Sequence, residues 1–334
     1  MAVTLYNGSG QTIDVCGTYT GNVELTVGTG GNFATLNEAF AAITEKYPAY
    51  VQGGLAINIK ILSGTTINEQ IAIQKADFSY VTITAVDSYV PVNVDGFTAQ
   101  GLNTHDLRTP NTGALIGGEN GAGLPCIGCV FKVTQNTDDL KIVGYFANRS
   151  SKGVVLPSSG FDSFYDGCIS NNESSITIRQ GIAKNCTRYG VHARHNGEVS
   201  ARSADLTNNG IAAYADRVAN LDCREADCSG STQAVVAYHA SQICAAGTHC
   251  TGGGAGSGTG TLIGSQSGSM IDCNGMEIKD PDCHDIFGVA YGGFITVCSL
   301  SNFSNANNCG VFSVTRNTFS GYHGVILADS DYTS

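Results

Sequence analysis

Short apolar segments recur every 20 to 24 residues in the middle of this 334-residue chain. Each copy contains two such segments, and the second begins eight residues after the first. The paired segments begin at Val191 and Val199, at Ile211 and Ala219, and at Val235 and Ile243. Two weaker copies open at Gly288 and Gly310. A repeat of this length, made of short segments with no helical stripe, indicates a solenoid of stacked strands.

In such a solenoid each strand pairs with its counterpart one coil along, about 4.8 Å away, so residues one period apart stack. The alignment predicts four interior columns whose twelve members are all apolar, as a dry interior requires. These columns are Val191/Ile211/Val235, Ala193/Ala213/Ala237, Val199/Ala219/Ile243 and Ala201/Leu221/Ala245. The copies lack the leucines of leucine-rich repeats, and helical repeats need longer units. We therefore predict an all-β fold, a single-stranded right-handed parallel β-helix.

One helix precedes the repeats. Thr35 and Glu38 fit a capping box, and the helix is expected from about Thr35 to Tyr47. Its apolar stripe comprises Leu36, Phe40, Ile43 and Tyr47. We expect residues 1–53 to form an N-terminal segment whose helix caps the first coil. Residues 54–334 would then form the β-helix, roughly a dozen coils less loop insertions. A Gly/Ser-rich stretch near 251–269 lacks the ending of a phosphate-binding loop and is expected to be a loop between coils.

Charge and composition argue against several classes of partner. The formal net charge of −11 argues against nucleic acid, whose phosphates require a surplus of Lys and Arg. No stretch approaches the roughly 18 apolar residues of a membrane span. The first residues have neither the basic nor the apolar part of a secretory signal, although an export route that needs no signal remains open.

The 13 cysteines are odd in number and irregularly spaced. In a chain long enough to bury its own core, most of them are expected to be reduced thiols that pack as small hydrophobes. Cys126 and Cys129 form a single C-x-x-C motif without a second pair or nearby histidines. No metal or other cofactor is therefore predicted.

Two parts of the chain resemble known β-helices. The segments GNFATLNEA (31–39) and INIKILSG (57–64) resemble the entry of pectin-active, pectate-lyase-like β-helices, and the Gly-apolar-x-Ala coils at 190–246 resemble those of bacteriophage tailspikes and tail fibres. The pectin methylesterase motif is matched only loosely, by Asp285-Ile286-Phe287-Gly288, and the chain has no tryptophan.

The tailspike resemblance implies a homotrimer on a phage tail or baseplate, made in the host cytoplasm and carried in the virion. Such a protein binds, and often depolymerises, bacterial capsular or other surface polysaccharide. Two alternatives stay open: a tail fibre that binds glycan without cleaving it, and a free bacterial polysaccharide lyase or esterase. Fold alone does not choose among them.

Alternation along the strands predicts which side chains face outward. The expected outward columns are Arg194/Tyr214/Tyr238 and Arg179/Arg202/Asp222, with His192, Asp216 and His239 beside the first of them. The same residues are also typical of a surface ion pair between Arg202 and Asp222, a structural tyrosine ladder and solvated turn histidines. In a trimer the site could also lie between subunits.

Two chemistries fit this face. β-Elimination on a uronic acid needs a cation, here Arg179 or Arg202, and a base. The candidate bases are His192, His239, Tyr214 and Tyr238. Glycoside hydrolysis needs two carboxylates, about 5 Å apart if retaining and about 6.5–9.5 Å apart if inverting. Candidates are Asp205, Asp216, Asp222, Glu225 and Asp227. We predict catalytic roles for His192, His239, Arg202 and Asp222, and substrate-binding roles for Arg179, Arg194, Tyr214, Tyr238 and Asp216.

Overall fold

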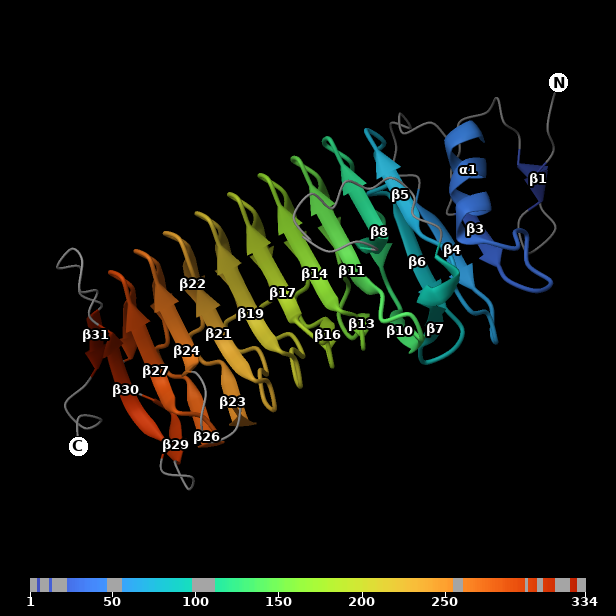
Figure 1. Ribbon diagram of the computed structural model, residues 1–334. Helices are drawn as coiled ribbons and strands as arrows, with labels where there is room; N and C mark the ends of the chain where they lie inside the picture. The colour runs from blue at the N-terminus through green and yellow to red at the C-terminus, as the bar shows by residue number, and fades with distance from the viewer. Residues whose placement is uncertain are drawn as a thin grey trace.

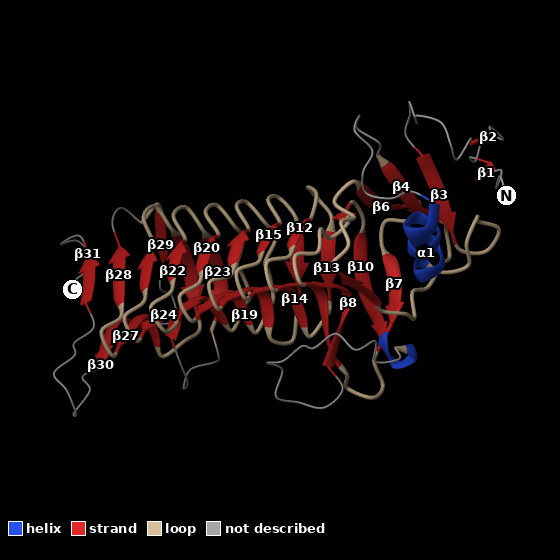
Figure 2. Cartoon of the chain, turned by 90° about the horizontal axis from the view of Figure 1, so that it is seen from above, coloured by secondary structure: helices blue, strands red, loops and turns tan. Residues whose placement is uncertain are grey.

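The computed structural model describes residues 5–6, 12–13, 23–46, 56–97, 112–254, 261–297, 300–304, 309–315 and 325–328. In this part of the chain, parallel strands stack coil upon coil into a β-solenoid of about nine turns (Figures 1 and 2). The parallel β-helix expected from the repeat is confirmed, and its right-handed sense stays a prediction. No helix among these residues is long and apolar enough to cross a membrane.

The longest side of the solenoid is a sheet of ten parallel strands, which Figure 1 shows side by side along the axis. Its strands are β5 (Ile71–Gln74), β8 (Thr112–Glu119), β11 (Lys141–Asn148), β14 (Asp166–Asn171), β17 (Tyr189–Arg194), β19 (Ile211–Asp216), β21 (Gln233–Ala237), β24 (Thr261–Gln266), β27 (Asp285–Ala290) and β30 (Gly310–Thr315). Neighbouring strands come from successive coils, so the order along the sheet follows the order along the chain.

A second side is a sheet of eight shorter strands. They are β12 (Lys152–Val154), β15 (Ser175–Thr177), β18 (Glu198–Ser200), β20 (Asn220–Asp222), β22 (Gln242–Cys244), β25 (Met270–Asp272), β28 (Phe294–Val297) and β31 (Val325–Ala328). The third side comprises a four-stranded and a three-stranded sheet, which isolated bridges connect. Its strands are β7 (Val90–Asn93), β10 (Val130–Gln135), β13 (Gly160–Asp162), β16 (Ile182–Lys184), β23 (His249–Gly253), β26 (Glu277–Pro281) and β29 (Asn302–Ser304).

The N-terminal end contains a sheet of four parallel strands and the helix α1 (Leu36–Lys46). The four strands are β3 (Val23–Val27), β4 (Ile57–Ile61), β6 (Val81–Ala85) and β9 (Cys126–Ile127). A short antiparallel pair, β1 (Leu5–Tyr6) and β2 (Thr12–Ile13), and a 3₁₀ turn, η1 (Val94–Gly96), complete the elements. Because β3 pairs with β4, strand stacking begins before the helix in sequence.

Helix α1 covers the N-terminal end of the solenoid, as both views show. The capping box is present: the Glu38 amide donates to Thr35 Oγ1 at 3.2 Å, and the Thr35 amide donates to Glu38 Oε2 at 3.3 Å. Leu36, Phe40 and Ile43 are buried against the core. Tyr47, the last expected residue of the stripe, lies outside the described residues. The predicted cap is therefore confirmed over residues 36–46.

Apart from Ile211, the predicted interior residues face inward, but the columns are misaligned in the middle coil. Val191 pairs with Ala213, and Ala213 with Val235, whereas Ile211 pairs with Tyr189 and Gln233. The true columns are Val191/Ala213/Val235, Ala193/Ala215/Ala237 and Val199/Leu221/Ile243. In the fourth column, the residue stacked one coil beyond Ala201 is Cys223, not Leu221. Ala219 lies beside Ser241 instead of Ile243. All the predicted interior residues are buried except Ile211, which is half-buried at the start of its strand.

The expected loop near 251–269 is wrong at both of its flanks, where strands lie instead. Residues 251–253 belong to β23, and β24 and the start of β25 follow at 261–266 and from residue 270. Residues 255–260 lie outside the described residues. The glycines of this stretch therefore do not prevent its flanks from joining two of the sheets.

Candidate functional site

Aromatic side chains gather on the outer face of the ten-stranded sheet, over β17, β19 and β21. Tyr214 projects outward because its neighbours Ala213 and Ala215 fill the interior. Its ring stacks on that of Tyr189, with centroids 4.7 Å apart and planes inclined by 10°. His192 lies 4.7 Å from both rings, and Tyr238 meets Tyr214 edge-on at 5.9 Å. We call Tyr189, His192, Tyr214 and Tyr238 the aromatic cluster.

His192 is the best-buried polar member of this cluster, with 5% of its surface exposed. Neither of its ring nitrogens has a hydrogen-bond partner among the residues that the structure describes. Burial, reinforced by the nearby Arg194, lowers the pKa of His192 well below its usual value. The imidazole is therefore neutral, and an orphaned buried polar group of this kind calls for an explanation. Its burial also denies a substrate direct access, which argues against the catalytic role predicted for it.

Burial keeps the neighbouring phenols protonated. It raises the pKa of Tyr214, and the Asp216 carboxylate adds to the effect. The same two causes raise the pKa of Tyr238. Both residues can therefore donate a hydrogen bond or a proton, but they are poor proton acceptors.

His239 is the accessible base beside the cluster. Its side chain is 56% exposed, and its Nδ1 lies 2.5 Å from Oδ1 of Asp216, which is only 10% exposed. The other carboxylate oxygen, Oδ2, lies 3.6 Å from Nε of Arg194 and 3.6 Å from Nε of Arg217. A carboxylate that orients Nδ1–H of a histidine leaves Nε2 as a proton acceptor. This is the arrangement that general base catalysis needs.

The polar contacts continue from Asp216 along the edge of the sheet. Arg217 Nη1 lies 2.8 Å from His195 Nε2, and His195 Nδ1 lies 2.9 Å from Asn171 Oδ1. Asn171 donates to Asn148 at 3.3 Å, and Asn148 donates to Glu119 at 3.0 Å. The network therefore reaches from the coil of β8 to that of β21, so the position of each side chain depends on its neighbours.

Strained turns lie beside this network. In eight coils of the described chain, the strand of the ten-stranded sheet is followed by two residues with positive φ. They are 120–121, 149–150, 172–173, 195–196, 217–218, 239–240, 267–268 and 291–292. The outer turns have glycine second, at 121, 268 and 292, whereas the five middle turns do not. Left-handed backbone costs an ordinary residue about 1–2 kcal/mol, and β-branched Val218 at φ 64° is a clear outlier.

Four of these middle turns line an open groove of about 530 Å³. Its lining residues are Arg149, Ser150, Asn172, Glu173, His195, Asn196, Arg217 and Val218. Strained backbone concentrates at functional sites, where surrounding structure enforces it. We call the groove lined by these eight residues the ridge groove. Arg217 lines the groove and also lies beside Asp216, which contacts His239, and the His239 ring lies 5.9 Å from that of Tyr238, so the groove adjoins the aromatic cluster.

A buried carboxylate holds a cation at the other side of the cluster. Both oxygens of Asp166, which is fully buried, accept hydrogen bonds from Arg188, at 2.9 and 2.5 Å. The guanidinium lies between the rings of Tyr165 and Tyr189, 4.7 and 4.5 Å from their centroids. Sequence reasoning missed all four residues. Their signal was weak, because they lie at or just before strand starts, where alternation does not tell which way a side chain points.

The structure divides the nine predicted site residues between two sides of the solenoid. His192, Arg194, Tyr214, Asp216, Tyr238 and His239 lie together on the ten-stranded side, whereas Arg179, Arg202 and Asp222 lie along the eight-stranded side. The two expected columns are misaligned, although the step from Arg179 to Arg202 is correct, because the Gln180 amide donates to the Arg202 carbonyl. Arg194 pairs with Asp216, and His192 with Tyr214. Asp222 pairs with Ser200 and Cys244.

In the described part of the chain, Arg202 and Asp222, expected as a surface ion pair, each bind another residue instead. Asp222 accepts two hydrogen bonds from Arg224, at 2.8 and 2.7 Å, and Arg202 donates to Glu225 at 2.8 Å. Arg179 donates to Ser200 at 2.9 Å. A groove of about 250 Å³ over this sheet includes Asp222 and Asp272. The basic and acidic groups here balance one another locally and lie away from the aromatic cluster.

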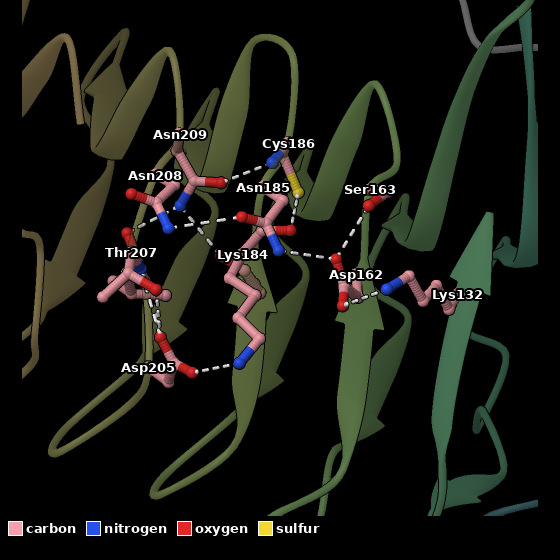
Figure 3. Close-up of polar contacts among 12 residues, drawn as sticks. Lys132, Asp162, Ser163, Lys184, Asn185, Cys186, Asp205, Thr207, Asn208 and Asn209 are labelled. Atoms are coloured by element: carbon pink, nitrogen blue, oxygen red, sulfur yellow. Dashed lines mark hydrogen bonds and ion pairs between the residues drawn. The ribbon is translucent and has the colours of Figure 1, made fainter. Parts of the chain in front are cut away.

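A third set of polar residues lies on the third side, in Figure 3. Asp205 accepts a hydrogen bond from Lys184 at 2.9 Å and from Thr207 at 2.7 Å. Asp205 is the register partner of Asp227, one coil along. The same drawing shows Asp162 between Lys132 and Asn185. Among the described residues, no group of three or more His, Cys, Asp or Glu side chains is arranged to hold a metal ion.

Comparison with known proteins adds no family. No protein-family model matches this chain, and no curated protein matches it. The parallel β-solenoid and the contacts above are therefore the basis for any functional conclusion.

Proposed function

We propose that this chain is a bacteriophage tailspike that binds and depolymerises a bacterial capsular or surface polysaccharide through the aromatic cluster and the ridge groove. The observation that carries the proposal is the contact of 2.5 Å between His239 Nδ1 and Asp216 Oδ1, next to three outward tyrosines. Aromatic faces with polar tips suit sugar rings, which present both C–H faces and hydroxyl groups. A β-solenoid fits polysaccharide-acting proteins, and the homotrimer, the phage tail and the virion belong to the proposal.

The reaction that this surface supports best is β-elimination on a uronic acid. Nε2 of His239 takes the proton from the carbon next to the carboxylate. The electron pair left on that carbon forms a carbon–carbon double bond as the C–O bond to the leaving sugar breaks, and the leaving oxygen takes a proton from the Tyr238 hydroxyl, whose raised pKa keeps it protonated. Arg217, at the mouth of the ridge groove, faces the substrate carboxylate and stabilises the charge that develops on it. Asp216 orients the base.

Glycoside hydrolysis is the second candidate, on the third side of the solenoid. Asp205 and Asp227 are register partners on adjacent coils, so their carboxylates are about 5 Å apart, as a retaining mechanism requires. The hydrogen bonds from Thr207 and Lys184 hold the pKa of Asp205 below its usual value despite its partial burial. Asp205 would then be the nucleophile and Asp227 the acid.

The test uses purified full-length chain and capsule from a sensitive host. Falling polymer length together with the ultraviolet absorbance of an unsaturated uronate supports elimination. Falling length without that absorbance supports hydrolysis, and binding without any loss of length supports a receptor-binding fibre.

A matched pair of variants locates the chemistry. His239→Gln removes the proposed base, whereas His249→Gln removes a similarly exposed histidine at the start of β23, whose Nδ1 lies 2.6 Å from Glu277 on another side. We expect a loss of at least about 100-fold for the first, in line with general base catalysis, and none for the second. Equal activity of both variants would contradict the assignment. A monomer in solution would move the proposal to a free polysaccharide lyase.

A further inference from the structure

Two cysteines meet where the last two coils of the ten-stranded sheet begin. Cys283 precedes β27, and Cys309 directly precedes β30, the edge strand of the sheet in its described order. Sγ of Cys309 accepts a hydrogen bond from the Cys283 amide at 3.3 Å and donates one to the Pro281 carbonyl at 3.0 Å. The thiol of Cys309 therefore lies directly against the backbone of Cys283.

The register suits a covalent link between them. Asp285 pairs with Gly310, so continuing the register places Cys283 one residue out of step with Cys309. One coil spacing combined with one residue of strand rise separates their Cα atoms by roughly 5.8 Å. This value lies within the roughly 4.4–6.8 Å that disulfides span.

We propose that Cys283 and Cys309 form a disulfide when the protein meets a low-molecular-weight disulfide, and that this link ties the β30 coil to the β27 coil. The Cys309 thiolate attacks the reagent, which releases one thiol and leaves a mixed disulfide on Cys309. The Cys283 thiolate then attacks Cys309 Sγ and releases the second thiol. In total, two protein thiols lose two protons and two electrons, and the reagent is reduced to two thiols.

The two thiols have different parts in this sequence. Cys309 is half-buried and can be reached first, whereas Cys283 is buried. Burial raises the pKa of Cys283 to about 12, and the contact with Cys309 adds to this, so Cys283 is a poor first attacker. Cys309 is therefore the attacking thiol and Cys283 the resolving one. The reaction should become faster as pH rises, because the thiolate is the reactive form.

Other thiols provide the contrast. Cys228 and Cys250 also interact, but both are buried within the solenoid. A reagent cannot reach either of them without unfolding the coil. Contact alone is thus not sufficient, and the partial exposure of Cys309 is what makes the proposed pair reactive.

The experiment treats the folded full-length chain with oxidised glutathione and maps cysteine-linked peptides by mass spectrometry. We expect the loss of two hydrogen atoms in one cross-link that joins Cys283 to Cys309. Cys283→Ser should instead accumulate a glutathione adduct on Cys309, and Cys309→Ser should react at neither position. Cys228→Ser should behave as the wild type does. Hydrogen exchange of the β30 amides should slow by about tenfold or more in the cross-linked chain.

Two results would overturn the proposal. One is a wild-type chain that keeps a stable glutathione adduct on Cys309 while Cys283 stays a thiol. The other is a cross-link that joins any other pair under the same treatment. Cys309→Ala tests the same point if the serine variant folds poorly.

Discussion

The ring of Tyr145 occupies the space that a β-carbon on Gly153 would need. A β-carbon built at Gly153 lies 2.3 Å from Cε1 of Tyr145, far inside contact distance. The tyrosine is fully buried, and its hydroxyl donates to the Pro125 carbonyl at 2.7 Å. It therefore cannot move aside without losing a buried hydrogen bond.

Gly153→Ala should accordingly destabilise the folded chain by about 1–3 kcal/mol, the usual cost of overpacking. Tyr145→Leu removes the clashing ring, so Gly153→Ala should cost less in that background. Chemical denaturation of the two single variants and the double variant measures the coupling. Additive effects would show that the two positions do not compete for the same space.

Ala213→Asp should prevent folding. Ala213 is fully buried between Val191 and Val235, so the new carboxylate would be unpaired in an apolar column. Asn220→Asp places the same charge on an exposed position of the next sheet and should fold normally. Soluble yield and circular dichroism of both variants decide the point. Soluble, folded Ala213→Asp protein would mean that residue 213 does not face inward.

The repeat was sufficient to predict the solenoid and nearly all of the inward residues, and the capping box with its apolar stripe was sufficient to predict the helix, but neither fixed the register. Shifting a strand by two residues keeps every side chain on the same face, so the hydrophobic pattern cannot distinguish Val191/Ile211 from Val191/Ala213. Because turns and insertions differ in length, the sequence does not show how many residues separate register partners on adjacent coils. That number is set by the hydrogen bonds between coils. For this reason the outward residues were found whereas most of their partners were not. Asp216, for example, lies beside Arg194 and His239, not merely near a corner.

Glu277 should make stability depend on pH in acid. Its hydrogen bonds with Lys279 and His249 lower its pKa from 4.5 to about 2. Because the folded-state pKa is depressed, this contribution is fully present above about 4.5 and is lost as pH falls towards about 2. Glu277→Gln should therefore melt below the wild type at neutral pH, with a difference that shrinks over this window. Lys279→Met removes the largest cause of the lowered pKa of Glu277, so stability should depend on pH over a narrower range in this variant. A difference that does not change with pH would contradict the ion network.

The Asp166–Arg188 pair should show strong coupling. Removing one partner of a buried ion pair costs about 3–5 kcal/mol, because the other charge is left without compensation. Arg188 is partly exposed, so we expect Asp166→Ala to cost somewhat less, about 2–4 kcal/mol. Arg188→Met in the same chain should recover part of that loss. Equilibrium unfolding of the single and double variants gives the coupling energy. A value near zero would show that the two hydrogen bonds between Arg188 and Asp166 contribute little to the stability of the fold.

Tyr238 provides the most direct test of glycan binding at the aromatic cluster. It is half-buried at the edge of the cluster, so Tyr238→Ala removes a contact face without opening the core. Tyr291→Ala is the control, because Tyr291 is 48% exposed in the turn that lies two coils beyond the turn directly after Tyr238. The chain has no tryptophan, so its tyrosine fluorescence can report binding directly. We expect Tyr238→Ala to weaken binding of host polysaccharide by at least about tenfold, as aromatic anchors do, and Tyr291→Ala to leave it unchanged. The same affinity for both variants would place the glycan on another side of the solenoid, where the Asp205–Asp227 pair would be the next candidate.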